Sequence, residues 1–154
     1  MKMEIIGNCV DGWDLDWYAV FNNNYIAHFT SDGTSAVPEE IRTSKINYDK
    51  IFDYFDNLKI NSEVDIIENN LPDFTLLNEF FFKNIKDRRE GYLRLFVETA
   101  SKSLFSYNIN FETNAYFLVA KPVIPLTLLE LPLNVRNIRY KLPEIIQPEA
   151  LNIS

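Results

Sequence analysis

Hydrophobic and polar residues alternate in two short segments near the N-terminus and in two more after residue 103. The first pair is 16–21 (DWYAVF) and 25–30 (YIAHFT), and the second is 104–111 (LFSYNINF) and 115–122 (AYFLVAKP). Alternation places successive side chains on opposite faces of a strand. The asparagines at 22–24 tolerate the left-handed backbone angles of a tight turn. The pattern therefore predicts two β-hairpins.

Between the hairpins, hydrophobic residues recur at helical spacing. The segment 47–59 (NYDKIFDYFDNLK) predicts an amphipathic helix with Asn47 as its N-cap and with Phe55 on the buried stripe. The segments 73–89 and 92–104 have similar spacing, and Gly91 between them is the expected break.

Shorter signals complete the pattern. Pro38 suits the first turn of a short helix, and residues 60–72 fit either a short strand or an extended loop. Residues 126–132 (LTLLELP) predict one helical turn, and 135–142 (VRNIRYKL) alternate like a last strand.

The order of these elements favours an α+β fold. Two hairpins flank a central helical region, and a lone hairpin is marginal in water, so the two are expected to join in one sheet. We predict an antiparallel sheet built from the N-terminal and C-terminal hairpins, with about three helices packed on one face. No long polar linker or internal repeat divides the chain, so residues 1–154 are predicted to form a single domain.

The charge is uneven along the chain. Of the formal net charge of −7, residues 1–70 hold 5 Lys and Arg against 13 Asp and Glu, whereas residues 71–154 hold 10 against 9. An acidic half repels phosphate backbones and disfavours nucleic-acid binding. The negative charge of this half attracts a basic protein partner. The same charge also keeps a protein soluble, without any partner.

Targeting and cysteine use indicate a cytoplasmic protein. The apolar stretch 115–133 is interrupted by Lys121, Glu130 and prolines, so no membrane span is expected. The N-terminal residues lack a basic region followed by a long apolar one. Cys9 is the only cysteine and can form no internal disulfide, which fits a reducing compartment.

Candidate chemistry concentrates in residues 11–38. Asp11, Asp14 and Asp16 do not match the ligand spacing of a calcium loop, because tryptophans and a leucine intervene and the glycine is misplaced. One histidine and one cysteine exclude a structural zinc site of the usual kind. We therefore expect no metal and no cofactor.

Catalysis is also disfavoured by the residues themselves. His28 would need Asp32 or an aspartate of the partner strand to orient it as a general base, and Cys9 has no neighbouring cation to activate it. The loop SDGTS (31–35) lacks the turn that exposes a serine nucleophile. The basic run KDRRE (86–90) fits a solvated helix end.

Two stretches carry a resemblance to a known group. "DWYAVFNNNYIAHFTSDGTSAVP" and "LFSYN…AYFLVAKPVIPLTLLELP" resemble small bacterial proteins encoded near polymorphic or contact-dependent toxins. The resemblance covers roughly half of the chain and implies an immunity protein without a catalytic motif. The usual first turn in that group holds an acid and a glycine, whereas this chain has three asparagines.

The leading hypothesis is an immunity protein that binds a cognate toxin domain, of a basic nuclease type, and blocks it. One alternative is a small hydrolase that uses His28 with nearby carboxylates. Another is an inhibitor from a phage or mobile element that acts on a host nucleic-acid enzyme. Tyr25 or a tryptophan would supply an aromatic anchor. The residues predicted to contact the partner are Asp11, Trp13, Asp14, His28, Asp32, Glu39, Glu40, Asp49, Asp53 and Asp56.

Overall fold

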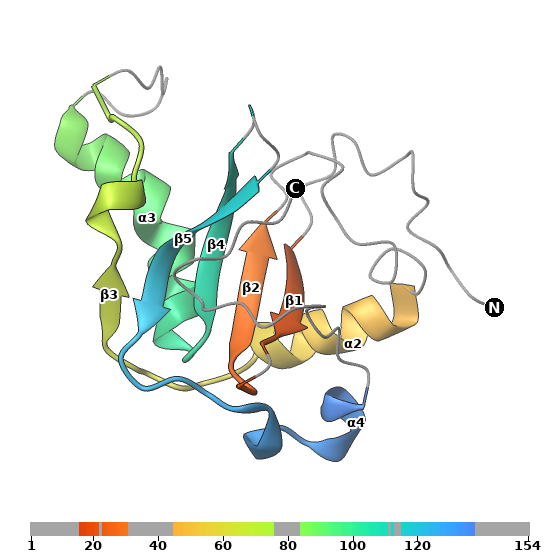
Figure 1. The fold of residues 1–154 in the computed structure, drawn as a ribbon. Coiled ribbons are helices and arrows are strands. Elements are labelled where there is room, and N and C mark those ends of the chain that lie inside the picture. Colours follow the sequence, from red (N-terminus) through yellow and green to blue (C-terminus); the bar gives the residue numbers. More distant parts are fainter. Residues whose placement is uncertain are drawn as a thin grey trace.

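In the computed structural model, five strands form one sheet, and two helices of three turns or more pack against it (Figure 1). The structure describes residues 16–21, 23–30, 45–75, 84–110, 112 and 115–137. Within this part of the chain, the predicted α+β class is confirmed. The strands are β1 (Asp16–Val20), β2 (Ile26–Thr30), β3 (Val64–Ile66), β4 (Phe105–Asn110) and β5 (Ala115–Pro122).

Both predicted hairpins are present, and they meet in the middle of the sheet. The strand order is β1-β2-β4-β5-β3, so β2 of the first hairpin lies beside β4 of the second. These two strands run parallel, with Ala27 opposite Phe105 and Phe29 opposite Tyr107, whereas every other pairing is antiparallel. The sheet is therefore mixed. The prediction of an antiparallel sheet holds for every pair of strands except β2 and β4. A parallel pair needs a crossover connection, and helix α3 (Ile85–Ser101) lies in it.

The turn between β1 and β2 confirms the role predicted for the asparagines. Asn24 has φ 70, the left-handed region that Asn tolerates better than most residues. Its amide donates to the Phe21 carbonyl at 2.9 Å, and the Phe21 amide donates to the Tyr25 carbonyl at 2.8 Å. Tyr25 forms an isolated antiparallel bridge with Thr127, which ties the turn to the segment after β5.

Both long helices differ from their predicted bounds. Helix α2 (Lys45–Asp56) begins two residues before Asn47, so Asn47 lies inside the helix and is not its N-cap. Helix α3 (Ile85–Ser101) runs unbroken through Gly91, where the sequence predicts a break. Gly91 is tolerated because the same helix buries Leu93, Phe96 and Ala100 against the sheet, which outweighs a cost of about 1 kcal/mol for a helical glycine.

The start of α3 explains why the predicted helix 73–89 is too long. The side chain of Asn84 accepts a hydrogen bond from the Asp87 amide at 2.9 Å, which caps the helix at that point. Residues 73–75 are not helical, and residues 76–83 lie outside the described part of the chain.

The shorter elements settle the remaining predictions. Residues 60–72 contain both β3 and a 3-10 turn, η2 (Glu68–Asn70). The turn predicted within 126–132 is η3 (Leu128–Glu130), but the residues expected to begin a last strand at 135 instead form α4 (Leu133–Arg136). Residues 138–142 lie outside the described ranges, as does the short helix predicted at Pro38.

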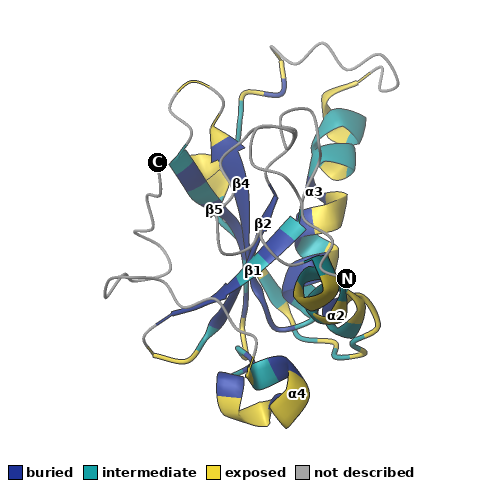
Figure 2. Ribbon diagram, turned by 90° about the vertical axis from the view of Figure 1, so that its right-hand side faces the viewer, coloured by how far each residue is buried: buried dark blue, intermediate teal, exposed yellow. Residues whose placement is uncertain are grey.

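The two faces of the sheet hold different cores. Figure 2 shows α2 and α3 on the same side of the strands. On this side, α2 and the segment after β5 bury one hydrophobic cluster with β1 and β2, and α3 buries another with β3 and β5. The opposite face carries an aromatic cluster, in which the fully buried Trp17 stacks on Phe29 with ring centroids 4.2 Å apart. His28 and Phe29 therefore point to opposite faces, as predicted.

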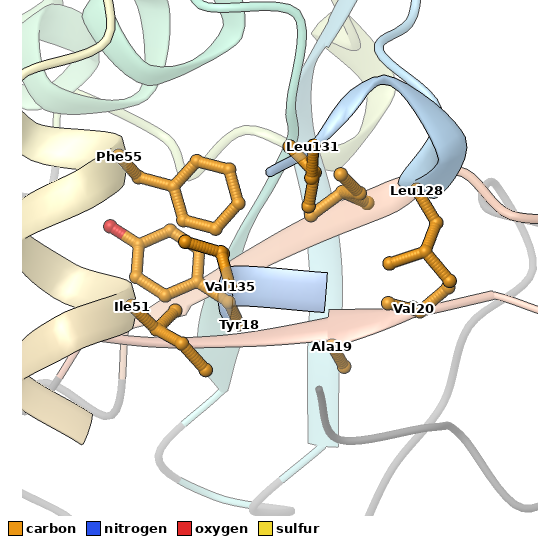
Figure 3. Close-up of a pocket in the computed structure, with 9 residues that line it drawn as sticks. Tyr18, Ala19, Val20, Ile51, Phe55, Leu128, Leu131 and Val135 are labelled. Atoms are coloured by element: carbon orange, nitrogen blue, oxygen red, sulfur yellow. The ribbon is translucent and has the colours of Figure 1, made fainter. Parts of the chain in front are cut away.

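A small void remains where α2 and α4 meet the first hairpin (Figure 3). Its volume is about 20 Å³, and Tyr18, Ile51, Phe55, Leu131 and Val135 are among the side chains that line it. This space holds at most one water, and the lining is almost entirely apolar. It is a packing gap in the core and not a ligand site.

The buried Tyr116 predicts a loss of stability at high pH. Burial raises the pKa of Tyr116 from 10.0 to about 12, and the hydrogen bond from Trp17 Nε1, at 3.1 Å, partly opposes this shift. A raised pKa means that the folded state holds the proton more tightly, so this stability is complete below pH 10 and is lost as the pH rises toward 12. We expect urea unfolding at the upper end of that window to show a loss of about 2 kcal/mol. In Tyr116→Phe this part of the loss should disappear, and an unchanged pH profile would contradict the assignment.

Candidate functional site

The most distinctive polar group on the helix-covered face is a row of three side chains from three strands. The imidazole of His28 lies between them, with Nε2 2.9 Å from Asp16 Oδ1 and Nδ1 3.2 Å from Ser106 Oγ. Because a carboxylate only accepts, Nε2 carries a proton toward Asp16, while Nδ1 and the Ser106 hydroxyl form the second hydrogen bond. His28 is 2% exposed and Ser106 is 0% exposed.

This row has the residue types of a hydrolase triad but not its accessibility. A nucleophile must reach a substrate carbonyl, and Ser106 lies inside a central strand with no exposed surface. Both ring nitrogens of His28 already have protein partners, so neither is free to take a proton from a bound molecule. The row is better described as a polar connection that joins β1, β2 and β4.

A hollow opens above this row, between the C-terminal halves of α2 and α3. Its volume is about 70 Å³, and its floor includes Asp16 and His28. Helix α2 contributes aromatic side chains and one carboxylate, and α3 contributes the polar side chains of the opposite wall. The lining residues are Asp16, Tyr18, His28, Phe52, Phe55, Asp56, Leu95, Glu98, Thr99, Lys102 and Leu104.

The hollow carries more negative than positive charge. Three carboxylates line it, from Asp16, Asp56 and Glu98, against the single ammonium of Lys102. That ammonium donates to the carbonyls of Phe55 at 2.9 Å and Asp56 at 2.8 Å, so it closes the C-terminal end of α2. The charge of Lys102 is therefore held at the helix end.

Two hydroxyls in the hollow lack hydrogen-bond partners among the described residues. Thr99 is 8% exposed, and Tyr18 lies on the floor beside the imidazole, with ring centroids 5.3 Å apart. Burial raises the pKa of Tyr18 well above its ordinary value, and repulsion from the Asp16 carboxylate adds to this effect. Buried hydroxyls without partners are uncommon, and each is available to a bound group.

Four of the ten predicted contact residues lie in the described part of the chain, and only one is an exposed residue at the hollow. Asp56 lines it, and His28 lies in its floor, below the surface. Asp49 pairs with Lys45 at 2.6 Å, and Asp53 lines a shallow groove between α2 and α4 that Lys50 and Lys59 also line. The other six lie outside the described residues, namely Asp11, Trp13, Asp14, Asp32, Glu39 and Glu40.

The part of the hollow formed by α3 and its C-cap residue Lys102 was not predicted from the sequence. Leu95, Glu98, Thr99 and Lys102 follow helical spacing of three and four residues, which places them on one face of a helix. That spacing was visible, but it does not say which neighbouring element the face meets. The acidic partner of this face, Asp16, is separated from it by more than 70 residues.

Other kinds of site find no support in the described residues. Among them, no three His, Cys, Asp or Glu side chains come close enough together to hold a metal ion. None of the helices in the described ranges has both the length and the apolar character needed to cross a membrane.

No protein-family model, curated protein or solved structure matches this chain. The resemblance to immunity proteins thus stays a prediction, and the site must be interpreted from its own geometry.

Proposed function

We propose that this protein is a cytoplasmic immunity protein, which binds a basic toxin domain and neutralises it through protein–protein contact. The observation that carries the proposal is the acidic opening between α2 and α3. Asp56 and Glu98 are exposed there, neither side chain has a partner among the described residues, and exposed Leu95 lies beside them. A carboxylate pair around an apolar residue is a surface suited to a basic protein.

Electrostatics gives the opening a specific role in such a complex. A nuclease domain must hold phosphate and is therefore basic, so an acidic inhibitor attracts it and competes with its substrate. Charge complementarity acts mainly on the association rate, and the contacts at the opening then set how long the complex lasts.

The hydrolase alternative has weaker support. Its required carboxylate is present, since Asp16 lies within hydrogen-bond distance of His28. However, the serine in the row is inaccessible, and a hollow of about 70 Å³ is small beside ordinary substrate pockets. The alternative of a phage-borne inhibitor shares the same acidic surface and differs only in the partner.

The proposal is tested with the product of the gene adjacent to the one that encodes this chain. We expect its toxin domain to bind with a Kd of about 1 μM or tighter by calorimetry, and to lose its activity when bound. Asp56→Asn and Glu98→Gln should each lower the association rate about threefold at low salt, and less at high salt.

Asp65→Asn is the matched control, because Asp65 is an exposed acid on the edge strand β3 that neither lines the opening nor belongs to the predicted contact residues. Its association rate should stay close to that of the unmodified protein. An adjacent gene product that is not a toxin, together with no measurable binding, would remove the support for an immunity role.

A further inference from the structure

We propose that the hollow between α2 and α3 binds the guanidinium group of a single arginine side chain from the protein partner. The inference rests on the proposed function for the source of that arginine, but the pocket itself can be tested without the partner. Four features of the hollow support arginine as the ligand, namely its size, its charge, its unpartnered hydroxyls and its apolar walls.

The size fits one planar cation. A buried water needs about 10–15 Å³ of such space, so about 70 Å³ corresponds to about five water-sized groups. A guanidinium has four non-hydrogen atoms. Larger ligands would require the helices to separate.

The charge favours a cation over an anion. Asp16 lies at the floor with its side chain 24% exposed, and only one of its oxygens has a partner among the described residues, namely His28 Nε2. Asp56 and Glu98 stand at the sides, and Lys102 is engaged with the end of α2. A carboxylate that is three-quarters buried with a free oxygen is a strong acceptor for a charged donor.

The hydroxyls favour arginine over lysine. A guanidinium carries five N–H donors in a fixed plane, whereas an ammonium carries three around one point. The hollow offers the free oxygen of Asp16, the carboxylate of Glu98, and the hydroxyl oxygens of Tyr18 and Thr99 as separate acceptors. Several acceptors spread around a small space match a fork of donors better than a single charge.

The walls suit the rest of the side chain. Phe52 on α2 and Leu95 on α3, which is 44% exposed, are apolar lining residues on opposite sides of the hollow. The methylene stem of an arginine packs against such surface while its head remains polar. An aromatic ring next to a guanidinium adds a cation–π contribution.

The test uses the full chain and three acetylated, amidated tripeptides, Gly-Arg-Gly, Gly-Lys-Gly and Gly-citrulline-Gly, in amide-detected NMR titrations. Citrulline keeps the shape of arginine but has no charge. We expect saturable shifts around the hollow with a Kd of about 1 mM for the arginine peptide, and binding about tenfold weaker for citrulline. The lysine peptide should bind about threefold more weakly than the arginine peptide.

Variants separate the pocket from a general acidic field. Thr99→Val has the same shape and removes an unpartnered hydroxyl, so it should fold normally and weaken arginine binding about threefold. Glu98→Gln should weaken it by about the same factor. Asp53→Asn is the matched control, since Asp53 is an exposed acid on α2 outside the hollow, and should leave binding unchanged.

Several results would overturn the proposal. These are no saturation by the arginine peptide at about 20 mM, equal binding of citrulline and arginine, equal binding of lysine and arginine, or an Asp53→Asn effect as large as that of Glu98→Gln. Its failure is distinguishable from failure of the immunity role. A toxin bound normally by Thr99→Val, which keeps the charge of the opening, would leave the role intact without the pocket, and peptide binding without a toxin partner would do the reverse.

Discussion

Replacing Trp17 with alanine is expected to lower the free energy of unfolding by about 4 kcal/mol, the largest single effect we predict. Trp17 has no exposed surface, stacks on Phe29 and meets the edge of Tyr116 with ring centroids 5.7 Å apart. Its indole N–H also donates to the Tyr116 hydroxyl. The substitution removes the ring from the centre of the aromatic cluster and leaves a cavity between strands of both hairpins.

Guanidinium denaturation followed by far-ultraviolet circular dichroism measures this loss. A small domain has a total stability of about 5–15 kcal/mol, so Trp17→Ala should unfold at a much lower denaturant concentration. Leu129→Ala is the control, because Leu129 is a large apolar residue that is exposed, and it should change the stability by less than about 0.5 kcal/mol. A cost below about 1 kcal/mol for Trp17→Ala would show that this face is not a packed core.

The second large effect is expected at the Asp16–His28 pair. Removing the buried imidazole with His28→Ala leaves a cavity, a mostly buried carboxylate without its donor, and a Ser106 hydroxyl without its hydrogen-bond partner. We expect a cost of about 3 kcal/mol in the free energy of unfolding. The partial exposure of Asp16 keeps the value below that of a fully buried ion pair.

A double-mutant cycle isolates the interaction from the cavity. Asp16→Ala, His28→Ala and the double variant should give a coupling energy of about 1–2 kcal/mol. The same cycle on Lys45 and Asp49, an exposed pair one helical turn apart, should give about 0.3–0.5 kcal/mol. Equal coupling in the two cycles would mean that the buried row does not hold the strands together.

The hairpins were predictable because their information is local. Alternation fixed the faces of β2, and the asparagines marked the turn, where Asn24 adopts the left-handed conformation that the prediction requires. The parallel contact between β2 and β4 was not predictable in the same way. It depends on how the crossover returns the chain to the sheet, and no residue near either strand encodes that direction.

The helices show that a residue typical of helix ends does not by itself predict where a helix ends. Gly91 reads locally as a break, yet tertiary packing of α3 against β3 and β5 overrides it. At the site, the sequence identified His28 and Asp56 as functional candidates, but it could not place one in the floor and the other at the rim. The sequence offered either Asp32 or an aspartate of the partner strand as the carboxylate that would orient His28, and Asp16 on that strand has this position.

The seam between β2 and β4 also has a consequence for the order of folding. Each hairpin closes between neighbouring segments, but His28 and Ser106 are 78 residues apart. Pairing β2 with β4 therefore costs much more chain entropy than closing either hairpin. The hollow takes its floor from the first hairpin and its α3 wall from the chain just before the second, so it exists only after this long-range closure. Newly made or partly opened chains therefore lack the hollow, and a molecule that binds there would stabilise only chains in which β2 and β4 are already paired.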